Sequence, residues 1–186
     1  ITQLFKICLL PFAWLYDAIT SIRNWAFDHQ YLSETSFNIP IINVGNLAVG
    51  GTGKTPHVEY ITQLLHKKYK TATLSRGYKR KTKGLVFADQ HANAYTIGDE
   101  PMQYYYKFSD VTVAVCEKRV DGINGILNKD KATNIIICDD AYQHRYIKPD
   151  INILLTDYKK TYAHDYLMPY GRLRENKHGD KRAQII

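Results

Sequence analysis

The chain has 186 residues, of which 45% are hydrophobic and 23% are charged, and it carries a formal net charge of +7. This length and composition exclude a disordered chain and predict one domain with a full core. Three cysteines without ligand spacing favour reduced, buried thiols over a disulfide framework or a zinc site.

The first expected element is a helix near the N-terminus. The apolar segment that begins at residue 4 is interrupted by Lys6, Pro11 and Asp17, so it is too short to cross a bilayer, and it lacks a signal-peptide cleavage site. From residue 15 onward the pattern is amphipathic. The apolar face would either pack on the domain core or lie in a membrane interface. It comprises Leu15, Ala18, Ile19, Ile22 and Trp25, opposite Asp17, Thr20, Ser21, Asn24 and Asp28.

Strands and helices alternate along the rest of the chain. Runs of β-branched and apolar residues predict strands at 39–46, 71–75, 84–88, 111–116, 133–140 and 151–157. Helices are predicted from Pro56, at 99–108 and at 117–127. This alternation is typical of a mostly parallel sheet covered on both sides. We therefore predict a three-layer α/β domain at 37–186, preceded by a helix and linker at 1–36.

A glycine-rich loop, NVGNLAVGGTGKTP, joins the first strand to the next helix. Its glycines allow backbone N–H groups to point at phosphate oxygens, and the helix N-terminus adds its positive end. Lys54 would reach the β and γ phosphates of a nucleotide, and Thr55 would hold Mg²⁺. The strict motif has a glycine where Ala48 stands, but residues 50–55 make the phosphate cradle. The predicted ATP-binding residues of this P-loop are Ala48, Val49, Gly50, Gly51, Thr52, Gly53, Lys54 and Thr55.

Acidic residues occur where such a loop requires them. The run IIICDD places Asp139 and Asp140 at the C-terminal end of a strand, where ligands bind in parallel sheets. In GDEP, Asp99 and Glu100 stand at the start of a helix, which they could simply cap. Asp99 is alternatively a catalytic base that meets the attacking hydroxyl.

Basic residues indicate an anionic partner. Residues 66–83 contain eight Lys or Arg and no acid, which suits phosphate, anionic lipid, nucleic acid or a solvated surface. Arginine binds phosphate bidentately, so arginines in DDAYQHR and LMPYGRLRE could hold a phosphorylated substrate, or form surface salt bridges. The predicted substrate-binding residues are Asn46, Arg76, Arg119, Gln143, His144, Arg172 and Arg174.

Six blocks in order resemble the tetraacyldisaccharide 4′-kinase family: LLPFAWLY, VGNLAVGGTGKTP, LSRGYKRK, GDEP, DDAYQHR and LMPYGRLRE. A small residue at the position of Ala48 is common in that family, whereas Ala141 and Tyr142 replace its commoner Gly and Phe. The resemblance implies a P-loop kinase that phosphorylates the 4′-hydroxyl of a tetraacyldisaccharide 1-phosphate with ATP and Mg²⁺, giving lipid IVA in lipid A biosynthesis.

The resemblance also implies roles for individual residues. Asp99 would act in base catalysis with a histidine beyond residue 186, Lys54 would act on the phosphates, and Glu100, Asp139 and Asp140 would join Thr55 at Mg-ATP. The substrate would lie in the inner membrane, so we expect the N-terminal helix to bind an anionic membrane surface on the cytoplasmic side, with no nucleic-acid or protein partner. Because the chain begins with Ile1 and ends on RAQII, we expect a fragment truncated before a second lobe.

Other functions fit less well. A partition-type P-loop ATPase needs a lysine where Val49 stands, and the NKDK at 128–131 precedes the strand that a GTPase signature should follow. A nucleic-acid-binding module could use the basic run, but that run lacks the aromatic spacing of a stacking platform. The partition-type ATPase and a basic anion- or nucleic-acid-binding module remain the alternatives.

Overall fold

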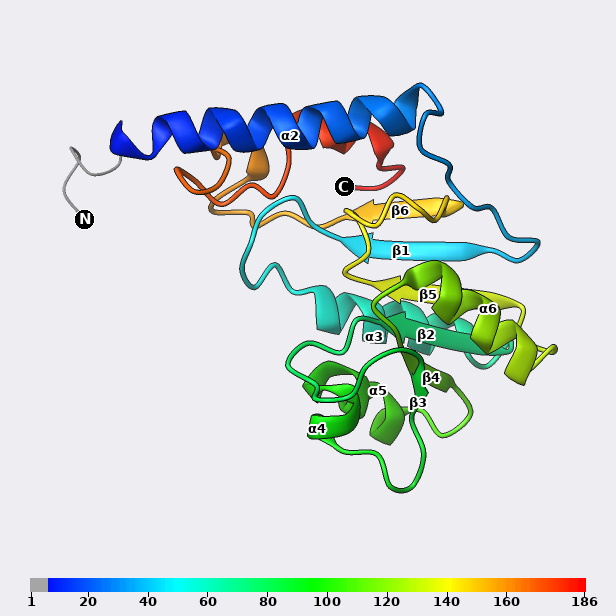
Figure 1. Ribbon diagram of the computed structural model, residues 1–186. Coiled ribbons are helices and arrows are strands. Elements are labelled where there is room, and N and C mark those ends of the chain that lie inside the picture. The colour runs from blue at the N-terminus through cyan, green and yellow to red at the C-terminus, as the bar shows by residue number, and fades with distance from the viewer. Residues whose placement is uncertain (1–6) are drawn as a thin grey trace.

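The computed structural model describes residues 7–186, and one mostly parallel sheet organises them (Figure 1). Its strands follow the order β3-β4-β2-β5-β1-β6, and only β3 is antiparallel to its neighbour. The predicted parallel sheet is therefore confirmed. The bounds are β1 Ile41–Gly45, β2 Thr71–Ser75, β3 Val86–Phe87, β4 Thr112–Val115, β5 Ile135–Asp139 and β6 Ile151–Leu154.

Helices cover both faces of this sheet. On β5, Ile136 and Cys138 belong to a core cluster with α6 (Arg119–Lys129), while Ile137 points the other way, into a cluster with α3 (Lys54–Leu65) and α5 (Asp99–Lys107). Alternate side chains of one strand thus enter two cores, which explains the continuous apolar run of β5. The result is the predicted three-layer α/β fold.

The N-terminal helix α2 (Leu10–Asp28) lies apart from the sheet, along the C-terminal segments (Figure 1). Its inward face is largely polar: the Tyr16 hydroxyl donates to the Arg174 carbonyl at 2.7 Å, and Arg23 donates to the Gln143 carbonyl at 2.8 Å. The predicted apolar face points outward, with Leu15 61%, Ile19 58% and Ile22 66% exposed. The alternative in which this face packs on the core is therefore wrong.

The described part of the N-terminal unit begins at residue 7, so residues 1–6 of the predicted segment 1–36, including Lys6, lie outside the described range. Within residues 7–186, no helix combines the length and apolar character needed to cross a membrane. Cys116 and Cys138 are buried and free, as expected, but the expectation is wrong for Cys8, whose free thiol is exposed.

Short elements differ most from the predictions. The strand expected at 84–88 is only two residues long, and three short helices were not predicted: α4 (Ala94–Ile97), η1 (Tyr162–His164) and η2 (Lys177–Arg182). A capping box explains α4, because the Asn93 side chain accepts from the backbone N–H groups of Tyr95 and Thr96. Such caps stabilise a single turn, which is too short to produce hydrophobic periodicity.

The basic run at 66–83 is divided by β2 (Thr71–Ser75). Residues 66–70 precede that strand and residues 76–83 follow it, so the two halves lie at opposite ends of β2. Within residues 76–83, the Arg80 side chain is buried and already has partners. It pairs with Glu117 at 2.7 Å and donates to the Gly84 carbonyl at 2.6 Å. The run is therefore not one continuous anion-binding surface.

Candidate active site

A cavity of about 790 Å³ opens at the C-terminal ends of β1, β2 and β5, where the P-loop meets α2. It gathers residues from segments that are distant in the sequence, and it includes three carboxylates together with the P-loop lysine. The lining residues are Tyr16, Thr20, Arg23, Val49, Gly50, Lys54, Thr55, Ser75, Arg76, Gly77, Tyr78, Glu100, Asp139, Asp140, Gln143, His144, Met168 and Arg174.

The P-loop uses glycine where the backbone requires it. Gly50 and Gly53 have φ angles of 119° and 78°, in the left-handed region that side chains rarely adopt. Gly53 stands directly before α3, so the loop delivers Lys54 and Thr55 to the positive end of that helix. This is the cradle that the GTGKT sequence predicts.

Ala48 stands in an extended segment. It forms an isolated antiparallel bridge with Leu173, and both side chains are buried in one apolar cluster with Leu47. On either side, Val49 donates to the Arg172 carbonyl at 2.8 Å, and the Arg174 N–H donates to the Leu47 carbonyl at 2.7 Å. Residues 172–174 therefore brace the first half of the loop, and the glycine bend of the strict motif has no role at position 48.

Asn46 is a second brace and lies outside the cavity lining. Its side chain is completely buried and donates to the Thr52 hydroxyl at 2.8 Å, across the base of the loop. Its carbonyl accepts from the Gln143 amide at 2.9 Å. The structure thus uses Asn46 to hold the P-loop, while its predicted contact with substrate stays a prediction.

The two aspartates after β5 have different environments. Asp139 is 6% exposed, and burial raises the pKa of its carboxyl to about 6 even though a hydrogen bond from Tyr104 acts in the opposite direction. Its Oδ2 accepts from the Tyr104 hydroxyl at 2.8 Å, whereas Oδ1 has no partner among residues 7–186. Asp140 is more open, and its Oδ1 lies 3.0 Å from Arg174 and 3.6 Å from Lys54.

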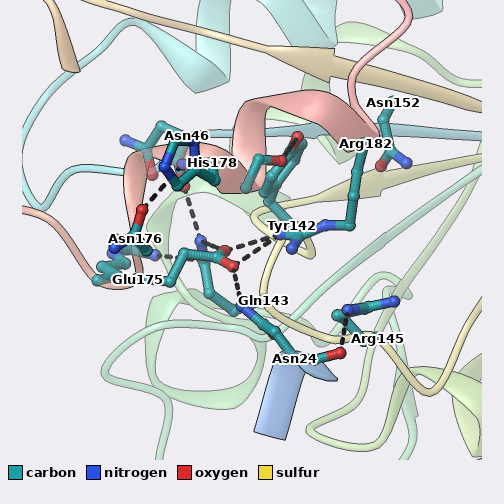
Figure 2. Close-up of polar contacts among 12 residues, drawn as sticks. Asn24, Asn46, Tyr142, Gln143, Arg145, Asn152, Glu175, Asn176, His178 and Arg182 are labelled. Carbon is teal, nitrogen blue, oxygen red and sulfur yellow. Dashed lines mark hydrogen bonds and ion pairs between the residues drawn. The ribbon is translucent and has the colours of Figure 1, made fainter. Parts of the chain in front are cut away.

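A buried carboxylate at Glu175 joins three segments beside the cavity. Figure 2 shows it between Asn24 of α2, Gln143 of the loop after β5 and Arg182 of η2. It accepts from Asn24 at 2.8 Å, from Gln143 at 2.9 Å and from Arg182 at 2.9 Å. Since a buried charge must be paired and hydrogen-bonded, this arrangement ties α2 to the loop that follows β5. The sequence motif includes Glu175 but gives no indication of these partners.

Tyr142 also gains a role that its sequence position did not reveal. Its hydroxyl, which the commoner phenylalanine lacks, donates to the Gly179 carbonyl at 2.7 Å. The Arg182 guanidinium lies 4.8 Å from the centre of its ring. The tyrosine therefore anchors η2 against the loop that carries the site aspartates.

The remaining predicted substrate-binding residues divide into two groups. Arg76, Gln143, His144 and Arg174 line the cavity. Burial, together with the charges of Arg119 and Arg76, lowers the pKa of His144 to about 4, so this side chain is neutral at pH 7. A neutral imidazole in this position can donate or accept a hydrogen bond, but it adds no charge.

Arg119 and Arg172 are not in the lining. Arg119 is 2% exposed and donates to the backbone carbonyls of Cys116 and Asp139, so its guanidinium supports the end of β5. Arg172 forms an ion pair with Asp165 at 2.7 Å. Their predicted contacts with substrate stay predictions. Each arginine would have to release its present partners before it could bind a substrate.

Of the two acids at the start of α5, only Glu100 lines the cavity; Asp99 is exposed beside it. Both lie in the first turn of the helix, where negative charge is favourable. The structure brings Glu100 to Asp139 and the P-loop from a different part of the chain. The catalytic role of Asp99 stays a prediction.

The family model for tetraacyldisaccharide-1-P 4′-kinase matches residues 5–186. The chain belongs to this family. Tetraacyldisaccharide 4′-kinases of Flavobacterium johnsoniae and Bacteroides fragilis are each 54% identical to it, over 99% and 96% of the chain. These matches cover 54% and 48% of the two relatives, so the chain spans about half the length of the curated relatives it matches.

A solved structure supports the same assignment. The apo form of LpxK from Aquifex aeolicus, crystallised in complex with ATP, is 38% identical and superposes with a TM-score of 0.88. The match covers 96% of this chain and 57% of that one. The predicted family and the P-loop-like α/β fold are thus confirmed.

Proposed function

We propose that the full-length protein transfers the γ-phosphate of ATP to the 4′-hydroxyl of a tetraacyldisaccharide 1-phosphate, giving lipid IVA in lipid A biosynthesis. The observation that carries this proposal is a single cavity in which the GKT loop, the Asp139–Asp140 pair and the amphipathic helix α2 meet. A kinase for a lipid acceptor needs these three features within one site, whereas a soluble P-loop ATPase has no need of the third.

The nucleotide phosphates would lie against the backbone N–H groups of residues 50–55. Lys54 would leave its 3.6 Å contact with Asp140 and pair with the β and γ phosphates, a stronger partner for an ammonium. Asp99, together with a histidine outside residues 1–186, would take the proton of the acceptor hydroxyl. Positioning and charge stabilisation supply most of the catalysis in such transfers.

The residues present fit Mg²⁺ that arrives with the nucleotide. Across the described range 7–186, no three His, Cys, Asp or Glu side chains form a metal cage. Mg²⁺ needs no such cage, since it keeps waters and substrate phosphates and takes one or two carboxylates from the protein. The buried, unpartnered Oδ1 of Asp139 suits this role, with Thr55, Glu100 and Asp140 as the other candidates. The metal would neutralise charge that develops on the phosphates.

The acceptor would lie between α2 and the P-loop. Tyr16, Thr20 and Arg23 of α2 line the cavity, while its outer face exposes Leu15, Ile19, Ile22 and Trp25 to the surroundings. One helix therefore offers a polar side to a sugar phosphate and an apolar side to acyl chains or lipid. This arrangement supports peripheral binding to an anionic membrane surface, at the cytoplasmic face of the inner membrane.

The proposal is tested by incubating the full-length protein with labelled ATP and a panel of lipid A precursors. Label should appear at the 4′ position of the tetraacyldisaccharide 1-phosphate, and Lys54→Ala should abolish the transfer while the protein remains folded. Lys67→Ala is the matched control, because Lys67 is exposed and lies before β2, away from the cavity. Turnover retained in Lys54→Ala would refute the assignment, and ATP hydrolysis that ignores the acceptor would favour the partition-type ATPase.

A further inference from the structure

Tyr104 is a completely buried tyrosine on α5, and it is absent from the motifs that indicate a kinase. Its ring packs in the apolar cluster with Val58, Phe108 and Ile137. Its hydroxyl donates to Asp139 Oδ2 at 2.8 Å. Burial and the adjacent Asp139 charge raise the pKa of Tyr104 above its usual range, so the phenol keeps its proton and acts as a donor.

The contact leaves one oxygen of Asp139 available. Oδ2 is occupied by Tyr104, whereas Oδ1 is buried and has no partner within the described part of the chain. A carboxylate held by one oxygen has a defined orientation, and its second oxygen can then coordinate a cation without first being reoriented. Thr55, another candidate metal ligand, lines the same cavity as Asp139.

We propose that Tyr104 is a positioning residue of the metal–nucleotide site: its phenol hydroxyl orients Asp139 of β5 so that the second carboxylate oxygen faces the metal. The inference rests on the proposed function, because it assumes that this cavity binds Mg-ATP. It assigns Tyr104 no direct contact with metal or substrate.

The position of Tyr104 in α5 extends this role. Glu100 and Tyr104 are four residues apart on the helix, so they lie on the same face. Glu100 lines the cavity at the first turn, and Tyr104 anchors the second turn to Asp139. The same hydrogen bond therefore joins the helix that carries Asp99 and Glu100 to the strand that carries the aspartates.

The test is Tyr104→Phe in the full-length protein, with a fluorescent ATP analogue titrated in the presence and in the absence of Mg²⁺. Loss of a hydrogen bond to a charged group should weaken binding about tenfold when Mg²⁺ is present. Binding without Mg²⁺ should stay within about twofold, because residues 50–55 contact the phosphates independently. Tyr106→Phe is the matched control: it removes the same hydroxyl from the same helix, where the side chain is 79% exposed, and should change neither titration.

Each result leads to a decision. An equal loss with and without Mg²⁺, or no loss at all, would overturn the proposal and make Tyr104 a residue of the core alone. Failure of the unsubstituted protein to bind the analogue under either condition would instead overturn the proposed function. If Tyr104→Phe does not fold, Asp139→Asn keeps an oxygen acceptor for the phenol, and the same Mg²⁺-specific loss is expected. An unchanged Mg²⁺ dependence in that variant would also refute the inference.

Discussion

Replacement of Ala48 by glycine would restore the strict P-loop motif, yet we expect it to destabilise the protein. Position 48 is extended, 8% exposed and bridged to Leu173, so a left-handed bend has no place there. The neighbouring bonds, Val49 to Arg172 and Arg174 to Leu47, both depend on this extended backbone. Glycine would keep the bonds but make the segment more flexible before folding.

The expected magnitude follows from two contributions. Loss of one buried methyl group costs about 0.8 kcal/mol. The greater backbone entropy of glycine in an extended segment costs about 0.5–1 kcal/mol more. The free energy of unfolding should therefore fall by about 1.5 kcal/mol, a tenfold change in the ratio of folded to unfolded protein. The affinity for ATP should remain the same, because the cradle begins at Gly50.

Chemical denaturation and nucleotide titration of Ala48→Gly together check this expectation. Ala132→Gly is the matched control, since Ala132 is exposed in a turn and its methyl group is not buried. It should cost clearly less stability than Ala48→Gly. A variant at position 48 that lost no stability and bound ATP more tightly would refute the reasoning, because the loop would then need the glycine bend.

Two further predictions concern pH and membrane binding. The pKa of His144 is about 4 in the folded protein and 6.5 when unperturbed, so the unfolded chain binds more protons between these values and stability falls as the pH drops through this window. At pH 5 the protonation of His144 in the unfolded chain lowers the free energy of unfolding by about 2 kcal/mol. His144→Gln should remove this loss, which denaturation curves at pH 7.5 and pH 5 would measure. The same pH dependence in the variant and in the unsubstituted protein would contradict the prediction. Ile19→Glu with Ile22→Glu should weaken sedimentation with anionic vesicles at least about tenfold, because it places two charges on the exposed face of α2. The polar face should still hold the helix, and unchanged sedimentation would exclude this face as the membrane contact.

Much of the fold was predictable because its signals are local. The strands β1, β2, β4 and β5 are almost entirely buried, so apolar residues cluster there in runs that the sequence shows directly. The GTGKT sequence predicts its own backbone, since Gly50 and Gly53 occupy conformations that other residues avoid. The two-residue β3 and the three short helices are stabilised by caps or by neighbouring segments. They are too short to produce a periodic hydrophobic pattern in the sequence.

The orientation of α2 shows why amphipathicity alone was insufficient. The sequence indicates two faces but does not say which one meets the domain. The choice depends on partners far along the chain, such as Asn24 with Glu175 and Tyr16 with the Arg174 carbonyl. These contacts turn the polar face inward and leave the apolar face exposed.

The sequence by itself determined a P-loop, an acidic strand end and a parallel α/β fold, because each of these features depends on residues that are close together in the chain. Only the tertiary structure decided which side chains reach the cavity and which support it. Arg119 braces β5, Asn46 braces the P-loop, and Tyr104 meets Asp139, 35 residues away. Hydrogen bonds between residues that are distant in the sequence depend on how the helices and strands pack, and this packing cannot be predicted from a local sequence pattern.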